Sequence, residues 1–311
     1  LLVRPGIDAI LAGLSWFDAM RAHPMKGWIG AFAAGGVARA EQPEMVLLLP
    51  NSFRSALIAR RSGARRRVGY ATDGRRLLLS DPVAPPARSQ PVPAVDWYAS
   101  LLERALGIAV ENRRPELFTT AGERSRAAAL LEQAGERYAV LVPGANRADK
   151  RWPVKGFAAL AAHLRERHGL RVVLIGSPAE RPLLDELERM CGSGTLNAAA
   201  WKLDLGAIKA VIASATVVVS NDTGPRHVAA ALGAPTAALF GPTDHRWTTL
   251  PVEHQRLVIA EPFLPDTLTA DRHAMVCRID RISPGDVCFA VDALLARADG
   301  GGRAAPDVPP R

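Results

Sequence analysis

The chain has 311 residues, of which 48% are hydrophobic and 23% are charged, a composition that excludes a disordered protein and a length that favours two domains. Its three cysteines are widely spaced, which excludes a disulfide framework and a zinc knuckle. No apolar run nears the roughly 20 residues that span a bilayer, which excludes a transmembrane helix. The formal net charge of +8 favours anionic partners such as phosphates, but only five of the 39 basic residues are lysines, so we attribute the charge to an arginine-rich composition and expect no nucleic-acid partner.

The first part of the chain alternates between strands and helices. Its opening stretch, LLVRPGIDAIL, is typical of the interior of a domain, so we expect residues to precede Leu1. An apolar strand is predicted over 45–49, and Ser52 is expected to cap the helix that follows it. The pattern then predicts a strand and turn over 68–74, a loop over 80–93 and a helix over 95–106.

A second series of elements begins near residue 138 and has the same rhythm. The alternation predicts an α/β fold with a doubly wound parallel sheet in each half. We place the boundary between the two halves within 119–138, at residue 130, and a second domain over 131–297. Residues 298–311 have too little apolar content to pack and are predicted to form a disordered tail. The predicted strands are 138–146, 170–177, 216–222 and 235–241, and the predicted helices are 157–169, 179–192, 204–215 and 225–233.

Polar residues follow a valine-rich strand at the point where a helix begins. Asp222, Thr223 and Gly224 stand there, where free backbone N–H groups and the positive end of the helix dipole favour a phosphate. His227, one turn later, is positioned to donate to the same anion. The alternative is structural, because Asp or Thr before a helix is most often an N-cap and a histidine in that helix is usually a packing residue.

Two further segments at strand ends carry charged candidates. Lys150, in GANRADKRWP, is placed to reach a diphosphate and stabilise it as a leaving group, although it also fits a solvated run of charges. Glu180, in GSPAER, is placed to accept from ribose hydroxyls, although it also fits a carboxylate at a helix start. No G-x-G-x-x-G follows any predicted strand, which argues against an NAD-dependent dehydrogenase.

In combination, these motifs resemble a known family. PGANRADKRWP, LIGSPAER and SNDTGPRHVAAALGAPTAALFGPTDHRWT resemble the carboxyl domain of the ADP-heptose:lipopolysaccharide heptosyltransferases, glycosyltransferase family 9. LLPNSFRSALIARRSGARRRVGY resembles the amino domain of the heptosyltransferase II branch, so the resemblance covers roughly residues 45–295. It implies a GT-B fold, in which two Rossmann-like domains face one another across a cleft. Residues 261–278 match no motif, and we assign them no role.

The resemblance also implies an activity and a set of donor contacts. The enzyme is expected to transfer L-glycero-D-manno-heptose from ADP-heptose to the inner core of lipopolysaccharide with inversion at the anomeric carbon. The expected location is cytoplasmic, peripheral on the inner face of the inner membrane. No D-x-D pair occurs in the sequence, so no metal or other cofactor is expected. By motif, Lys150 would contact the diphosphate, and the other donor contacts would be Asn146, Glu180, Asp222, Thr223, Gly224 and His227.

The acceptor side is assigned to the amino-terminal half. Asn51, Ser52 and Arg54 are the predicted acceptor contacts, because the phosphates and sugar acids of the core suit guanidinium groups. A solvated helix face is the equally weighted alternative for the arginines of this half, which include Arg60, Arg61, Arg65, Arg66 and Arg67.

The catalytic base of the family is the main departure. Family members carry an Asp in a Gly-containing loop after their first strand, whereas Asp8 and Asp18 lie in contexts that do not match that loop. We therefore interpret the sequence as truncated at its amino terminus and expect the 311-residue chain to bind donor weakly and to transfer poorly. A glycosyltransferase with another nucleotide sugar as donor, and a nucleotide-sugar-binding pseudoenzyme, stay open as alternatives.

Overall fold

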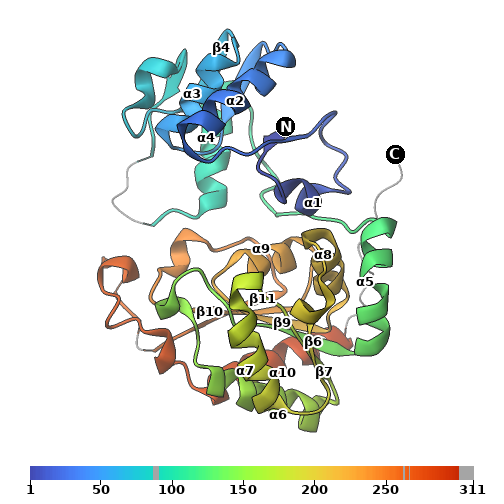
Figure 1. Ribbon diagram of the computed structural model, residues 1–311. Helices are drawn as coiled ribbons and strands as arrows, with labels where there is room; N and C mark the ends of the chain where they lie inside the picture. The colour runs from blue at the N-terminus through green and yellow to red at the C-terminus, as the bar shows by residue number, and fades with distance from the viewer. Residues whose placement is uncertain (87–90, 262, 266, 301–311) are drawn as a thin grey trace. The chain divides into compact units, whose positions relative to one another are not determined.

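The computed structural model describes residues 1–86, 91–261, 263–265 and 267–300, which divide into two compact units (Figure 1). The chain changes unit between residues 113 and 114, earlier than the boundary predicted at 130. The reason is helix α5 (Ala121–Ala134), which packs against α8 (Leu205–Ser214) of the carboxyl-terminal series. Unit 1 comprises residues 1–8, 15–113 and 246–249, and unit 2 comprises residues 9–14, 114–245 and the described residues from 250 onward.

Unit 1 contains a small parallel sheet with the strand order β3-β4-β5. Its strand β5 lies within the segment predicted as a loop over 80–93, and Pro82 fits there because β5 is an edge strand. On the other edge, β3 begins at Met45, which is 37% exposed. The elements are β1 (Leu2–Val3), β2 (Arg21–Ala22), α2 (Gly27–Ala40), β3 (Met45–Leu48), α3 (Phe53–Arg61), β4 (Arg66–Tyr70), the 3-10 helix η1 (Arg75–Leu78), β5 (Asp81–Val83) and α4 (Ala94–Leu106); α1 (Ile7–Leu11) spans the first change of unit.

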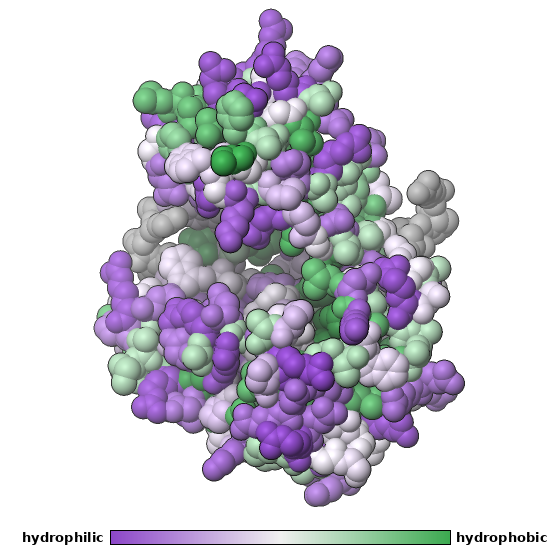
Figure 2. Space-filling view, in the orientation of Figure 1, coloured by the Kyte–Doolittle hydropathy of each residue, from purple (hydrophilic) through white to green (hydrophobic). Residues whose placement is uncertain are grey.

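The surface of unit 1 includes large apolar side chains, and hydrophobic atoms are visible on it in Figure 2. Trp28, Ile29 and Phe32 of α2 are each more than half exposed, and Leu77 of η1 is 93% exposed. Helix α2 was not predicted from the sequence, because its four glycines in GWIGAFAAGGVARA disguise the helical pattern.

Unit 2 is built on a large parallel sheet with the strand order β11-β10-β9-β6-β7-β8. All residues of β6, β9 and β10 are buried, as expected for parallel strands covered on both faces. The elements not yet given are β6 (Tyr138–Val142), η2 (Ala148–Lys150), α6 (Val154–His168), β7 (Arg171–Leu174), η3 (Pro178–Glu180), α7 (Arg181–Cys191), β8 (Thr195–Asn197), η4 (Ala198–Trp201), β9 (Val217–Asn221), α9 (Gly224–Ala231), β10 (Thr236–Phe240), η5 (His245–Trp247), β11 (Gln255–Ile259), η6 (Ala270–Arg272), η7 (Ile279–Arg281) and α10 (Pro284–Gly300).

Helices cover both faces of the large sheet (Figure 1). On one face, α6, α7 and α10 pack on alternate strand residues such as Leu141, Val219 and Leu239 to form one apolar core. Helices α5, α8 and α9 lie on the other face. Each half therefore has the α/β architecture that the alternation predicts. Helix α10 continues through residues 298–300 of the predicted tail, and the rest of that tail lies outside the described residues.

A buried ion pair fixes the amino-terminal segment of unit 2. Lys209 Nζ lies 3.0 Å from Glu123 Oε1, and the two side chains are 0% and 3% exposed. The same ammonium donates to the carbonyls of Ile10 at 3.1 Å and Ala12 at 2.7 Å. Residues 9–14 thus join unit 2 by satisfying the buried charge of a lysine that lies about 200 residues later in the chain.

In the part of the chain that the structure describes, none of the helices is both long and apolar enough to cross a bilayer.

Candidate functional site

The large sheet reverses its winding between β6 and β9. From β6 the chain winds outward through β7 to β8, and from β9 it winds the opposite way through β10 to β11. The loops that leave the carboxyl ends of β6 and β9 therefore diverge and leave space between them. In open α/β sheets this switch point is where ligands bind.

A pocket of about 1080 Å³ lies at these strand ends. Its lining comes from the loops after β6, β7 and β9 and from the region between β8 and α8. The structure thereby brings together six of the seven predicted donor contacts, which are far apart in sequence. They are Asn146, Lys150, Glu180, Asp222, Thr223 and Gly224.

Lys150 and Asp222 form the charged centre of this pocket. Lys150 Nζ lies 3.3 Å from Asp222 Oδ2, and the side chains are 15% and 9% exposed. The Thr243 hydroxyl donates to the same Oδ2 at 3.1 Å. The pairing disfavours the structural alternative for Lys150, a solvated run of charges, because most of this side chain is removed from water.

Asn221 attaches the lysine loop to strand β9, and its role was not predicted. Its side chain is fully buried, and its Oδ1 accepts from the backbone N–H of Trp152 at 3.2 Å. Its Nδ2 donates to the carbonyls of Pro143 at 2.9 Å and Gly144 at 3.2 Å. One buried amide therefore fixes both ends of the loop that carries Lys150. Since these partners are 69–78 residues from Asn221, no local sequence signal indicated them.

Helix α9 begins inside the pocket. Thr223 holds the N-cap position, but its side chain makes no capping hydrogen bond to the helix. Its hydroxyl instead lies 3.3 Å from the carbonyl of Asn221. Gly224 is exposed, and a Cβ at that position would meet no atom within 4 Å. The start of the helix therefore faces open pocket space, where its free N–H groups favour an anion.

Glu180 has both a structural role and a position in the pocket. It closes a capping box around η3, in which its Oε2 accepts from the backbone N–H of Ser177 at 2.7 Å and from the Ser177 hydroxyl at 2.8 Å. Its carboxylate also packs on Gly144, where a Cβ would lie 2.6 Å from Oε2. A glycine at 144 therefore leaves room for the carboxylate at the edge of the pocket.

His227, the seventh predicted donor contact, is not among the described residues that line the pocket. Its Nε2 lies 3.1 Å from Nη2 of Arg226, a fully buried guanidinium. Burial, followed by the positive charge of Arg226, lowers the pKa of His227 to about 4. The ring is therefore neutral at pH 7. Arg226 also approaches Asp222, with Nε 3.5 Å from Oδ1, and burial lowers its pKa to about 10.

The predicted acceptor contacts lie in unit 1 around a buried arginine. Ser52 caps α3 as predicted, accepting from the backbone N–H of Ser55 at 3.3 Å. Asn51 Oδ1 accepts from Nη2 of Arg75 at 3.2 Å, and Arg75 is 0% exposed. Arg75 also donates to the carbonyls of Pro50 and Tyr70. Arg75 thus shapes the loop after β3, while Arg54 lies exposed in the first turn of α3.

Several other arginines of unit 1 have structural partners. Arg61 stacks on the ring of Phe32 and donates to its carbonyl at 2.9 Å. Arg66 pairs with Asp81 at 3.3 Å, and Arg67 donates to the carbonyl of Leu78 at 2.9 Å. These contacts differ from the solvated helix face given as the alternative, because all three side chains have partners within unit 1 and Arg66 and Arg67 lie on strand β4. Arg60 and Arg65 are exposed.

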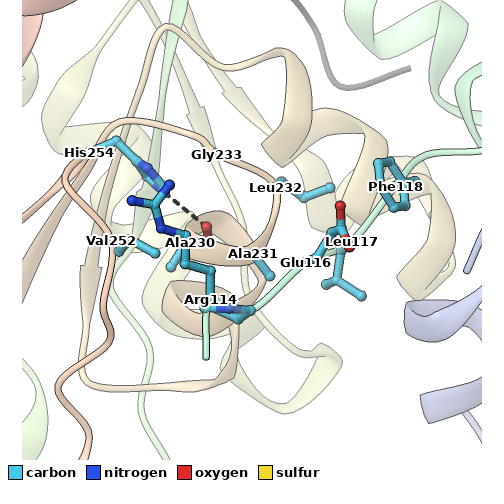
Figure 3. Close-up of a pocket in the computed structure, with 11 residues that line it drawn as sticks. Arg114, Glu116, Leu117, Phe118, Ala230, Ala231, Leu232, Gly233, Val252 and His254 are labelled. Atoms are coloured by element: carbon cyan, nitrogen blue, oxygen red, sulfur yellow. Dashed lines mark hydrogen bonds between the residues drawn. The ribbon is translucent and has the colours of Figure 1, made fainter. Parts of the chain in front are cut away.

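A smaller pocket of about 260 Å³ lies elsewhere in unit 2, between residues 114–118 and the end of α9 (Figure 3). His254 lines it and its Nε2 bonds to the carbonyl of Ala230 at 2.8 Å, drawn as a dashed line in Figure 3. No predicted site residue is among the described residues that line it.

Comparison with known families gives a match over most of the chain. The model of glycosyltransferase family 9 (heptosyltransferase) matches residues 37–270. Lipooligosaccharide heptosyltransferase 2 of Haemophilus influenzae is 32% identical over 242 residues, covering 70% of this chain and 68% of that protein. Lipopolysaccharide heptosyltransferase 2 of Escherichia coli is 30% identical over 238 residues, covering 72% and 67%.

Solved structures match the fold over nearly the whole chain. The structure of Escherichia coli ADP-heptose lipopolysaccharide heptosyltransferase II has a TM-score of 0.78 at 24% identity, covering 96% of this chain and 89% of that one. A family 9 glycosyl transferase from Veillonella parvula has a TM-score of 0.80 at 19% identity, covering 95% and 87%. The predicted GT-B fold class is thereby confirmed.

Proposed function

This chain belongs to glycosyltransferase family 9, the heptosyltransferases, and we propose that it transfers L-glycero-D-manno-heptose from ADP-heptose to the inner core of lipopolysaccharide. One observation carries the proposal. The loops after β6, β7 and β9 place a lysine, two carboxylates and an open helix start around one pocket at the switch point of the large sheet. This combination suits a nucleotide diphosphate joined to a sugar.

The diphosphate is assigned to Lys150 and the start of α9. Lys150 supplies a positive charge that is largely removed from water, so its attraction for a phosphate is stronger than at an exposed site. The N–H groups near Gly224 add the positive end of the α9 dipole. As the bond to the anomeric carbon breaks, negative charge grows on the departing diphosphate. Groups already fixed in place stabilise that charge without reorganising.

Asp222 and Glu180 are assigned to the two hydroxyl-bearing parts of the donor. Asp222 accepts from Lys150 and Thr243 through Oδ2, and its other oxygen, Oδ1, lies 3.5 Å from Nε of the buried Arg226. This arrangement holds the carboxylate beside the phosphate subsite, where it is placed to accept from heptose hydroxyls. Glu180 lies at the end of β7, where carboxylates of nucleotide-binding folds accept from ribose hydroxyls.

The acceptor is assigned to unit 1. Arg54 is exposed near the amino end of α3 and suits the phosphates or carboxylates of a lipopolysaccharide core. The acceptor hydroxyl must lose a proton during an inverting transfer, which requires a carboxylate or an equivalent base within hydrogen-bond reach. We assign that base to none of the described residues, and we infer that transfer does not require a metal cofactor.

Calorimetric titration of the purified chain with ADP and ADP-heptose tests the donor site. Lys150→Ala is expected to weaken binding of both ligands, and Asp222→Ala that of ADP-heptose, by roughly 10- to 150-fold, the value of a hydrogen bond to a charged group. Lys155→Ala is the matched control, because Lys155 is an exposed lysine in the first turn of α6 and outside the pocket lining. It is expected to bind like the unchanged chain.

The same titrations separate the alternatives. UDP-glucose is expected to give no measurable heat, and a preference for it over ADP-heptose would identify a different donor. Equal ADP-heptose affinity for the unchanged chain, Lys150→Ala and Asp222→Ala would contradict the donor site as assigned.

A further inference from the structure

Two histidines and an aspartate meet between α6 and α10 in unit 2. His163 Nε2 and His168 Nε2 each lie 2.7 Å from the same atom, Oδ1 of Asp292. The ligand-type atoms of the three side chains all lie within 4.8 Å of one another. None of the three lines the donor pocket, so the proposed heptose transfer gives this cluster no role.

The helices that carry the cluster are held in place without it. Leu160 and Leu164 of α6 and Val291 and Leu295 of α10 belong to the core on one face of the large sheet. Helix α6 ends at His168, because Gly169 then takes a left-handed conformation with φ of 63°. The core therefore fixes the positions of α6 and α10, so the three polar side chains lie close together before any ligand binds.

The three side chains are suited to a borderline cation. Neutral imidazole nitrogens and a carboxylate oxygen are ligands that zinc accepts, in sites with three protein ligands and water in the fourth position. The side chains of His163, His168 and Asp292 are 23%, 18% and 25% exposed, so solvent reaches the site and a water molecule can complete it. Arg167 Nε lies 3.4 Å from the other oxygen, Oδ2, which leaves Oδ1 facing the two rings.

The spacing of the cluster also suits a cation, because Oδ1 of Asp292 lies 2.7 Å from Nε2 of both rings. In a tetrahedral zinc site with bonds near 2.1 Å, neighbouring ligand atoms stand about 3.4 Å apart. Each ring would need to withdraw from Oδ1 by about 0.7 Å, a small side-chain rotation.

We propose that His163, His168 and Asp292 form a zinc-binding site that joins α6 to α10. The site does not depend on the identity of the donor. Helix α6 follows the loop that carries Lys150, and the indole Nε1 of Trp152 in that loop donates to the carbonyl of Ile282, just before α10, at 2.9 Å. A metal that binds only the folded chain stabilises it by mass action, so zinc is expected to raise the melting temperature of the chain.

Calorimetric titration of the full chain, without an affinity tag and after treatment with a chelator, tests the proposal with zinc chloride. One equivalent is expected to bind. His163→Ala and His168→Ala are expected to weaken binding at least tenfold and to abolish the zinc-dependent rise in melting temperature. His23→Ala is the matched control, because it removes a histidine of unit 1 and is expected to leave zinc binding unchanged.

Asp292→Asn separates a metal site from a hydrogen-bonded cluster. The asparagine retains an oxygen that accepts from the histidines but loses the anionic ligand, so the metal-free variant is expected to stay folded and to lose zinc binding. Circular dichroism checks the folding of each variant. Absence of zinc binding to the unchanged chain would overturn the proposal, and so would binding that survives in His163→Ala, His168→Ala and Asp292→Asn.

Discussion

Replacement of Gly144 by alanine provides a sensitive test of the donor site, because it acts on Glu180 without altering any charged group. A Cβ at residue 144 would lie 2.6 Å from Glu180 Oε2 and closer still to the rest of the carboxylate, whereas real Cβ contacts are at least 3.0 Å. The backbone at Gly144 does not have a positive φ, and the three atoms nearest to the added Cβ all belong to the Glu180 carboxylate. Gly144→Ala therefore has to displace the Glu180 side chain.

The expected loss follows from the contacts of that side chain. The carboxylate has to move by roughly 1 Å, and a misplacement of that size can cost about 100-fold in the rate of a catalysed reaction. If Glu180 accepts from the ribose, losing that hydrogen bond costs about 1.5–3 kcal/mol, or roughly 10- to 150-fold in affinity. Gly144→Ala and Glu180→Gln should then weaken ADP binding to similar extents, and their combination should weaken it little further.

Titration of ADP into each variant measures this loss, and thermal melting separates it from a loss of folding. Gly122→Ala is the matched control, because Gly122 lies in the first turn of α5 and a Cβ there meets only Arg126 Nη1 at 3.6 Å. It should leave ADP binding unchanged. Full ADP affinity in Gly144→Ala would refute the reasoning and reduce Glu180 to its capping role at η3.

Three further predictions concern stability, each measured by urea unfolding. Lys209→Met leaves the Glu123 carboxylate buried without its partner and should cost about 3–5 kcal/mol, whereas Lys155→Met at an exposed site should cost less than about 0.5 kcal/mol. A loss below about 1 kcal/mol for Lys209→Met would show that this pair contributes little. The pKa of His227 is about 4 in the folded chain and about 6.5 in the unfolded chain, so the unfolded chain binds more protons between these pH values. The free energy of unfolding should therefore fall by about 2 kcal/mol from pH 7 to pH 5. His227→Asn should remove that part of the pH dependence, and an unchanged profile would contradict it. Gly156→Ala would place a Cβ 2.6 Å from the ring of Trp152. It should destabilise the chain by about 1–3 kcal/mol, although alanine has the higher helix propensity. A stabilised variant would show that the indole can shift freely.

The fold was predictable where the sequence pattern is local. Valine-rich runs such as 217–219 predict strands that are buried on both faces, and the structure has them at the centre of the large sheet. Short or glycine-rich elements were missed. Strand β8 has three residues, too few to show a periodic pattern, and α2 contains four glycines.

The site was predictable as a set of strand ends but not as a network. Asp222 and Lys150 stood out because each follows an apolar strand, and the structure brings them within 3.3 Å. The buried side chains of Asn221 and Arg75 gave no such signal, because their hydrogen-bond partners, mostly backbone groups, lie in distant or irregular segments. The roles of these residues toward a donor or an acceptor stay predictions that the titrations test.

The contact of Lys209 with residues 9–14 has a consequence for the order in which the chain assembles during synthesis. Ile10 and Ala12 leave the ribosome early, but the ammonium that their carbonyls accept from lies 199 and 197 residues later. At roughly 5–20 residues per second, about 10–40 s separate the two events. For that interval the two carbonyls lack the ammonium that they accept from in the folded chain, while residues 15–113 of unit 1 are synthesised. Unit 2 therefore closes late, around a segment that was made well before the rest of it.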